Sequence, residues 1–223
     1  MRFRRLAVPA VIARDFMPRH HVIISGTGRA GTTFLMQLFT RLGLPTGFSD
    51  INSHVYPNCN AGMERDIRDP DAPYIIKNPR LCDYLEQVLE SGDVVIDQAI
   101  IPIRDPFSAA ESRRDVVRRT DPGLYAGPDQ IPGGLYNTCD PGMQEAVLAG
   151  LLHKLLHVLT KYDIPTTLLY FPRLIHDPEY LHGKIKSLLG QMDYDHFSGV
   201  FKEVARPDLV HNFCSTGANG IGE

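Results

Sequence analysis

The sequence predicts a single α/β domain with a central parallel sheet flanked by helices. Short apolar runs rich in Val and Ile alternate with segments of helical periodicity, a pattern typical of parallel strands joined by helical crossovers. The chain has 223 residues, a length that suits one domain with a sizeable buried core. We expect this domain to span residues 1–213, with an irregular arm at 1–19 and a fraying tail at 214–223.

Composition excludes several classes of protein. Hydrophobic residues make up 43% of the chain, charged residues 22%, and the net charge is −3, which argues against a nucleic-acid binder that works through bulk positive charge. The cysteines are scattered without a CxxC pair, so we expect free thiols and no bound metal. The N-terminal apolar stretch "LAVPAVIA" is too short to span a bilayer and makes a poor secretory signal. We therefore expect a cytoplasmic protein without a transmembrane segment; the sequence does not indicate an oligomeric state.

The expected strands and helices follow one another at short intervals. Pro102 lies inside an expected strand and indicates an edge position, because proline lacks the amide that a central strand needs. Asp105 is expected to cap the helix that begins at Pro106. The periodicities predict strands at 20–25, 74–77, 99–104 and 165–171, and helices at 32–42, 80–91, 106–120, 143–162 and 178–190.

Residues 121–142 differ from the rest of the chain. They contain four prolines and five glycines, so we expect no regular structure there. A loop of this length inside a compact domain is usually functional or disordered. With Tyr125, Leu135 and Tyr136, the segment is either a lid over a bound substrate or a disordered surface loop.

The stretch "ISGTGRAGTTFL" (24–35) joins the first expected strand to the first expected helix. Such a turn directs several backbone amides at one point, with the positive end of the helix dipole behind them. Gly26, Gly28 and Gly31 let the backbone approach a ligand closely, and Thr32 and Thr33 add hydroxyl donors. The stretch therefore predicts an anion site.

The triphosphatase pattern GxxxxGK[ST] is met at Gly26, Gly31 and Thr33, but Thr32 stands where that pattern has lysine. No expected strand ends in an acidic residue that would organise Mg²⁺; the strand at 99–104 ends instead in Arg104. The loop supplies its own cation, Arg29. These features favour a nucleotide anion bound without a metal ion.

Four segments resemble the sulfotransferases that use 3′-phosphoadenosine 5′-phosphosulfate (PAPS). "RAGTT" (29–33) matches their loop [K/R]-x-G-T-T at every fixed position, and "IPIRDPFSAAESRR" matches their second signature, with Ser112 eight residues after Arg104. "YIIKNPR" is similar to the Lys-x-Pro-Arg segment of a bacterial-type branch. Residues 166–190 are similar to its late strand, Asp-Pro turn and helix. The resemblance covers residues 20 to 190, and the first two motifs are its specific part.

The resemblance implies a P-loop-containing nucleotide-binding fold and an in-line transfer of a sulfuryl group from PAPS, leaving adenosine 3′,5′-bisphosphate (PAP). The acceptor would be a hydroxyl or amine of a small molecule, lipid or carbohydrate. Arg104 and Ser112 would hold the 3′-phosphate, and Arg29 and Lys77 would be the cations at the reacting centre. The residues that would cradle the 5′-phosphosulfate are Gly28, Arg29, Ala30, Gly31, Thr32 and Thr33.

This chain lacks a general base at two positions where branches of the family have one. One branch has a histidine two residues after the lysine of "YIIKNPR", where this chain has Pro79, and another has a glutamate just before it, where this chain has Ile76. A further bacterial group uses an acidic residue shortly after the loop helix, and Asp50 is nearest to that position. His54 is the other candidate, because its unperturbed pKa suits proton abstraction near neutral pH. Glu64 is a third possibility.

Alternative interpretations stay open. A kinase or triphosphatase with a degenerate loop would require Mg²⁺ and turn over ATP. A non-catalytic nucleotide-binding protein is consistent with the missing family bases. His153 and His157 stand four residues apart, as two metal ligands can on a helix, but no HExxH pattern or third ligand accompanies them, and packing among leucines is the favoured interpretation.

Overall fold

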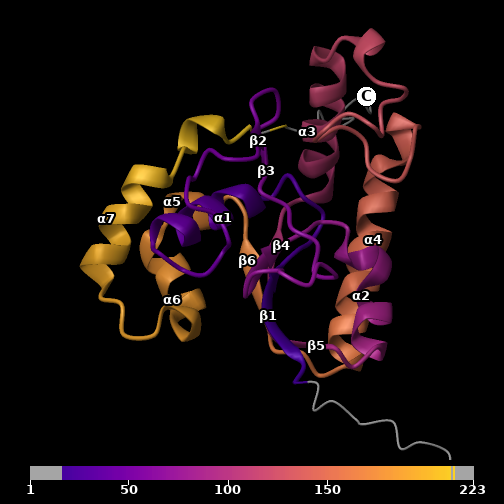
Figure 1. Cartoon of the computed structure of the whole chain (residues 1–223). Coiled ribbons are helices and arrows are strands. Elements are labelled where there is room, and N and C mark those ends of the chain that lie inside the picture. Colours follow the sequence, from indigo (N-terminus) through magenta and orange to yellow (C-terminus); the bar gives the residue numbers. More distant parts are fainter. Residues whose placement is uncertain (1–16, 212, 214–223) are drawn as a thin grey trace, which may run out of the picture.

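The computed structural model describes residues 17–211 and 213. The chain forms an α/β domain around a four-stranded sheet of order β4-β1-β5-β6, in which every neighbouring pair is parallel (Figure 1). This confirms the predicted fold class. The strands are β1 (Arg19–Ile24), β4 (Ile75–Lys77), β5 (Val94–Ile103) and β6 (Thr166–Tyr170).

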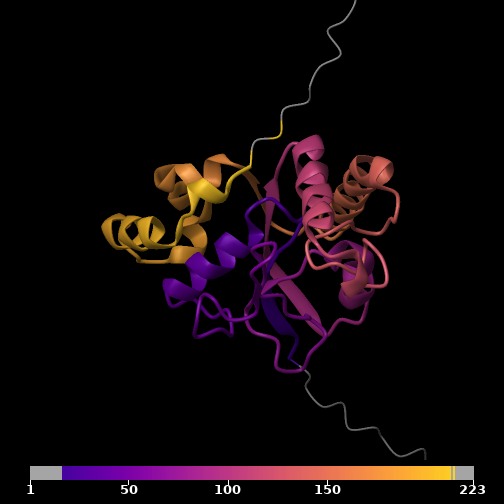
Figure 2. The ribbon, with the colours of Figure 1, turned by 90° about the horizontal axis from the view of Figure 1, so that it is seen from above.

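Helices cover both faces of the sheet (Figure 2). Successive side chains of a strand point to opposite faces, so Ile24 of β1 packs with the helices on one face and Ile23 with those on the other. The first face carries α1 (Thr32–Arg41), α5 (Arg173–His176), α6 (Pro178–Leu189) and α7 (Tyr194–Val204). The second carries α2 (Leu81–Glu90), α3 (Pro106–Arg119) and α4 (Gln144–Lys161).

Some elements were not predicted. β5 begins at Val94, earlier than expected, because its first half carries the polar pair Asp97 and Gln98, which hides the strand pattern. A short antiparallel hairpin, β2 (Val55–Tyr56) and β3 (Ala61–Gly62), follows α1. The signals for α7 are its Asp193 cap and the buried positions Phe197, Val200, Phe201 and Val204 at helical spacing.

The expectation of an edge position for Pro102 was wrong, because β5 lies between β1 and β6. The amide of Phe171, just after β6, donates to the carbonyl of Ile103, so the backbone groups of Pro102 face the other neighbour, β1. Pairing with β1 ends near Ile100, whose carbonyl accepts from Ser25. The missing amide of Pro102 therefore faces the loop after β1 and breaks no strand pairing.

The interpretation of His153 and His157 was also wrong. Both side chains are exposed, because the buried face of α4 runs through Leu148, Leu155 and Val158. The three cysteines in the described residues, Cys59, Cys82 and Cys139, are free thiols, as expected. The expected tail and most of the expected N-terminal arm lie outside the described residues.

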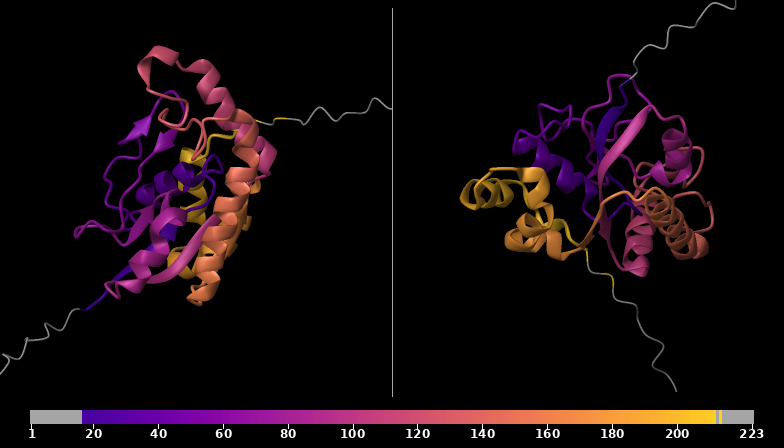
Figure 3. Two further views of the ribbon diagram at one scale, coloured as in Figure 1. Left: turned by 90° about the vertical axis from the view of Figure 1, so that its right-hand side faces the viewer. Right: turned by 90° about the horizontal axis from the view of Figure 1, so that it is seen from below.

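Residues 121–142 form no long element, as predicted. Their only regular structure is two single turns, η1 (Pro122–Leu124) and η2 (Pro141–Met143). Ile131, Leu135 and Tyr136 are buried, so the second half of the segment is packed against the domain. Figure 3 shows this segment at the same end of the molecule as the β2–β3 hairpin. Among the helices of the described residues, none combines the length and the apolar character needed to cross a bilayer.

Asp105 caps α3, the helix that carries Ser112 and Arg113, by accepting a hydrogen bond from the amide of Ser108 at 2.8 Å. We expect Asp105→Ala to lower the free energy of unfolding by about 1 kcal/mol, because that amide loses its acceptor. Urea denaturation followed by circular dichroism measures the change. Asp69→Ala, which removes an exposed carboxylate that caps no helix, is the control and should change stability by less than half as much; equal effects would contradict the capping role.

Candidate functional site

A cavity of about 890 Å³ opens beyond the carboxyl ends of β1, β4 and β5. This is the edge of a parallel sheet at which ligands usually bind, and the volume suits a small molecule or nucleotide. Four segments far apart in the sequence line it: the loop after β1, the hairpin at 55–62, residues 129–136 and residues 203–211. The second half of the 121–142 segment thus faces the cavity. Leu135 and Tyr136 belong to the cavity lining, whereas Tyr125 does not.

The loop between β1 and α1 presents backbone amides to this cavity. Gly26, Gly28 and Gly31 all have positive φ, and a Cβ on Gly28 would lie 2.7 Å from a guanidinium nitrogen of Arg113. Gly31 is the N-cap of α1 and provides no side-chain cap. Within residues 17–211 and 213, no group accepts a hydrogen bond from the amides of residues 28–33. The loop therefore holds a set of uncommitted donors at a helix N-terminus, a geometry suited to an anion.

Arg29 is the centre of the hydrogen-bond network in the site. Its backbone is left-handed, with φ 55°, and its half-buried side chain lies between α3 and the hairpin. Nε donates to Ser112 Oγ at 3.0 Å, and Nη1 donates to the carbonyl of Cys59. Burial lowers the pKa of Arg29. The same residue thus ties the loop, α3 and the hairpin together.

Arg104 follows β5 and also binds the loop. Its Nη1 donates to the carbonyl of Arg29 at 2.8 Å, and its Nη2 donates to the carbonyl of His211. Burial, together with the nearby charge of Arg29, lowers the pKa of Arg104 to about 10. Because one arginine holds the carbonyls of both Arg29 and His211, the C-terminal segment is fixed beside the cavity.

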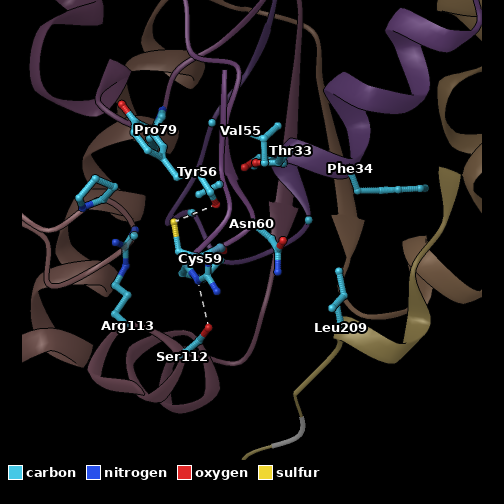
Figure 4. A pocket seen from close by; sticks show the side chains of 18 of the residues that line it. Thr33, Phe34, Val55, Tyr56, Cys59, Asn60, Pro79, Ser112, Arg113 and Leu209 are labelled. Carbon is cyan, nitrogen blue, oxygen red and sulfur yellow. Dashed lines mark hydrogen bonds between the residues drawn. The ribbon is translucent and has the colours of Figure 1, made fainter. Parts of the chain in front are cut away.

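Arg113 is a site residue that the sequence did not single out. It is 6% exposed, and its guanidinium donates to the carbonyls of Gly134 at 2.8 Å and Thr27 at 2.6 Å. Its Nε is buried without a partner in the described structure. Burial, then the charge of Arg29, lowers its pKa to about 10. Figure 4 shows Arg113 and Ser112 on the same side of the cavity.

Lys77 and Glu64 form an ion pair at the end of β4. Lys77 is 1% exposed, and its Nζ contacts Glu64 Oε1 and, at 3.5 Å, Thr33 Oγ1. Burial lowers the pKa of Lys77, and the charge of Glu64 opposes that shift. The predicted strand-end lysine is therefore a buried cation beside the first turn of α1, and Glu64 brings a carboxylate into the cavity lining.

The charges around the loop are unbalanced. Lys77 is paired with Glu64, but no ion pair between described residues includes Arg29, Arg104 or Arg113. Removing cations from water without counter-charges is costly, and Arg113 is buried while Arg29 and Arg104 are half-buried. Their hydrogen bonds all go to neutral groups, and Arg104 and Arg113 also lie over the rings of Phe171 and Tyr136. A bound polyanion would supply the missing negative charge.

Most of the predicted site residues meet in this cavity. The exceptions are Ala30, which is fully buried in the core behind the loop, and the two candidate bases Asp50 and His54, neither of which lines the cavity. Asp50 accepts from the amide of Asn52, and His54 packs beside Phe48. The predicted residues that line the cavity are Gly28, Arg29, Gly31, Thr32, Thr33, Lys77, Arg104 and Ser112.

Comparison with known proteins adds no assignment: no protein-family model matches the chain, and no curated protein or solved structure is significantly similar to it. What the site can do follows from its geometry. Free amides at a helix N-terminus and buried arginines without carboxylate partners are suited to a multiply charged phosphate or sulfate ester.

We expect inorganic pyrophosphate, as a simple polyanion, to raise the melting temperature of the protein. At 100 times its dissociation constant a ligand adds about 2.7 kcal/mol, which corresponds to roughly 5 to 10 °C for a domain of this size. Arg113→Gln should reduce this increase, because one buried cation is lost. Differential scanning fluorimetry at constant ionic strength measures the shift.

The matched control is Arg118→Gln. It removes an arginine of the same helix whose side chain is 57% exposed and forms ion pairs with Glu111 and Asp115. It should leave the pyrophosphate-induced shift unchanged. Equal loss in both variants, or no stabilisation of the parent protein, would contradict an anion site at Arg113.

Proposed function

We propose that this protein is a PAPS-dependent sulfotransferase with a nucleotide-binding fold of the P-loop type. The observation that carries the proposal is a set of three arginines, buried Arg113 and half-buried Arg29 and Arg104, that surround a glycine loop with free amides and have no carboxylate partners among the described residues. PAPS presents two groups of phosphate-type charge, and the arrangement offers donors to both. The sequence motifs indicate two of these arginines independently: Arg29 begins "RAGTT", and Arg104 with Ser112 forms the second signature.

The residues present fit this donor. Gly28 lets the guanidinium of Arg113 lie directly against the loop backbone, where a Cβ would clash with it, and Arg113 keeps an unpartnered Nε among the described residues. The loop amides and Arg29 would hold the phosphosulfate, and Arg104 with Ser112 would hold the 3′-phosphate. Ser112 lies on α3, which begins two residues after Arg104, and it is buried there together with Arg113.

The transfer is a single displacement. An acceptor oxygen forms a bond to sulfur, the bond between sulfur and the bridging phosphate oxygen breaks, and PAP leaves with that oxygen. Fixed cations and amides stabilise the charge that develops on the departing phosphate. Arg29 stays charged despite burial, because arginine remains protonated at neutral pH, and Lys77 beside Thr33 adds a second cation.

Glu64 is the residue we propose as general base. Its carboxylate lines the cavity and contacts Lys77, which orients it, whereas Asp50 and His54 do not line the cavity. At 37% exposure the Glu64 side chain can reach an incoming acceptor. The proton released by the acceptor hydroxyl passes to this carboxylate, so the charges of the step balance.

The alternative functions receive less support. A Mg²⁺-dependent kinase or triphosphatase needs a carboxylate at a strand end to organise the metal, and Glu64, the acidic residue beside the loop, is engaged by Lys77. A non-catalytic nucleotide-binding protein would need only the arginines and the loop amides. Glu64 beside Lys77 is the observation that favours catalysis over this second alternative.

We expect PAP to bind tightly without metal and much more tightly than ATP, with or without Mg²⁺. Isothermal titration calorimetry measures both affinities. Arg104→Ala should weaken PAP binding by at least about tenfold, because a charge-assisted hydrogen bond contributes roughly 1.5–3 kcal/mol. Arg118→Ala, on the exposed face of α3, is the control. A preference for Mg²⁺-ATP would instead indicate phosphoryl transfer.

We expect Glu64→Gln to lower kcat by about 10²- to 10⁴-fold, the range typical of a lost general base, while PAP affinity changes little. Transfer of labelled sulfate from PAPS, followed with a panel of alcohols, phenols and amines, measures the rate. Asp50→Asn provides the matched comparison, because its carboxylate lies outside the cavity lining. A loss in Asp50→Asn with normal turnover in Glu64→Gln would reverse the assignment of the base.

A further inference from the structure

The cavity has two sides of different character. Ser112 and Arg113 lie on one side, and Phe34 and Leu209 lie on the other (Figure 4). Phe34, Val55, Val204 and Val210 all pack in or against the same buried cluster, which makes this second side a continuous apolar wall. Leu209 is 41% exposed and extends the wall toward solvent. The wall comes from α1, the turn at Ile51, the hairpin and residues 204–210, and its lining residues are Phe34, Ile51, Val55, Val204, Leu209 and Val210.

The charged residues beside the apolar wall are already neutralised. Glu203 forms an ion pair with Arg41 at 3.1 Å, and Arg206 forms one with Asp208. The carboxylate nearest the loop, Glu64, is held by Lys77. This side of the cavity therefore offers no unpaired cation of its own to a negatively charged ligand among the described residues.

The negative charge of the donor matches the positive charge on the opposite side of the cavity. A phosphate monoester carries about −1.5 to −2 at neutral pH, so PAPS, with its 3′-phosphate and its phosphosulfate, brings roughly four negative charges. The arginines of the cavity lining that have no ion pair among the described residues, at positions 29, 80, 104 and 113, offer no more positive charge than that. Once the donor is bound, no positive charge is left over to attract an acidic acceptor.

We propose that the acceptor is an uncharged hydroxyl compound with an apolar body, which lies against the Phe34–Leu209 wall with its hydroxyl directed at Glu64. This inference rests on the proposed sulfotransferase function and specifies its acceptor. Apolar contact contributes the binding free energy of the acceptor body. A carboxylate on the acceptor would meet Glu64 and the charged donor without a compensating cation, so acidic sugars and acidic peptides are excluded.

The test compares 2-naphthol with 6-hydroxy-2-naphthoic acid, two phenols of the same ring system that differ by one carboxylate, and with the neutral sugar trehalose. Binding of each to the PAP-saturated protein is measured by calorimetry, and sulfate transfer from labelled PAPS is measured in parallel. We expect 2-naphthol to bind at least about tenfold more tightly than either of the other two probes. The naphthoic acid carries a carboxylate that no cation of the wall balances, and trehalose has no apolar body to contact the wall.

A pair of variants locates the wall. Leu209→Asp places a carboxylate on the exposed part of the wall and should weaken 2-naphthol binding at least about tenfold while PAP affinity is retained. Leu168→Asp introduces the same change at a leucine of β6 that is 47% exposed and outside the cavity lining. It should alter the affinity for neither 2-naphthol nor PAP. The two leucines are similarly exposed, so a general effect of the new charge on folding would affect both variants.

The possible results separate the two proposals. Failure of the parent protein to bind PAP would overturn the sulfotransferase function and this inference with it. Normal PAP binding with no binding of 2-naphthol, with equal binding of the naphthoic acid, or with tighter binding of trehalose would overturn the acceptor class alone. Equal loss of 2-naphthol binding in Leu209→Asp and Leu168→Asp would overturn its placement on this wall.

Discussion

The site depends on one electrostatic constraint: a buried arginine and two half-buried ones surround a glycine loop, and none of them forms an ion pair with a carboxylate of the described residues. Burial of such groups is tolerated here because backbone carbonyls of the loop, the hairpin and the 121–142 segment accept their hydrogen bonds. We therefore expect a bound polyanion to lower the electrostatic energy of the folded protein. Ligand binding and stability would then be linked through the same side chains.

The arginines also organise the parts of the cavity that have no regular structure. Arg113 of α3 holds the backbone at Thr27 and Gly134, and Arg29 joins the backbone at Cys59 to Ser112 of α3, so three irregular segments are attached to this helix. Irregular segments are ordinarily the more mobile parts of a domain. Here they share hydrogen-bond partners that a substrate would also contact, which couples the shape of the cavity to its occupancy.

The fold and half of the site were predictable from sequence, and particular residues show why the remainder was not. Glycine spacing and the helix start make the loop at 26–33 visible as a local pattern, and Asp105 with Pro106 marks the start of α3 in the same way. Arg113 gave no such signal. It differs from Arg114 only by the rotation of one helical step, which buries Arg113 and directs Arg114 to Glu111 and Glu145. Glu64 was only a third possibility for the base, since its contact with Lys77 depends on how the hairpin packs on β4.

Pro102 shows how a residue that is unfavourable for a strand can benefit a binding site. Backbone pairing between β1 and β5 reaches Ser25 and stops, and beyond that point Pro102 has no amide to offer to the loop. A residue with an N–H at this position could donate one further hydrogen bond toward β1 and lengthen the ladder. The proline thus limits the length of the sheet on this side, and the chain leaves the ladder after Ser25 to enter the glycine loop.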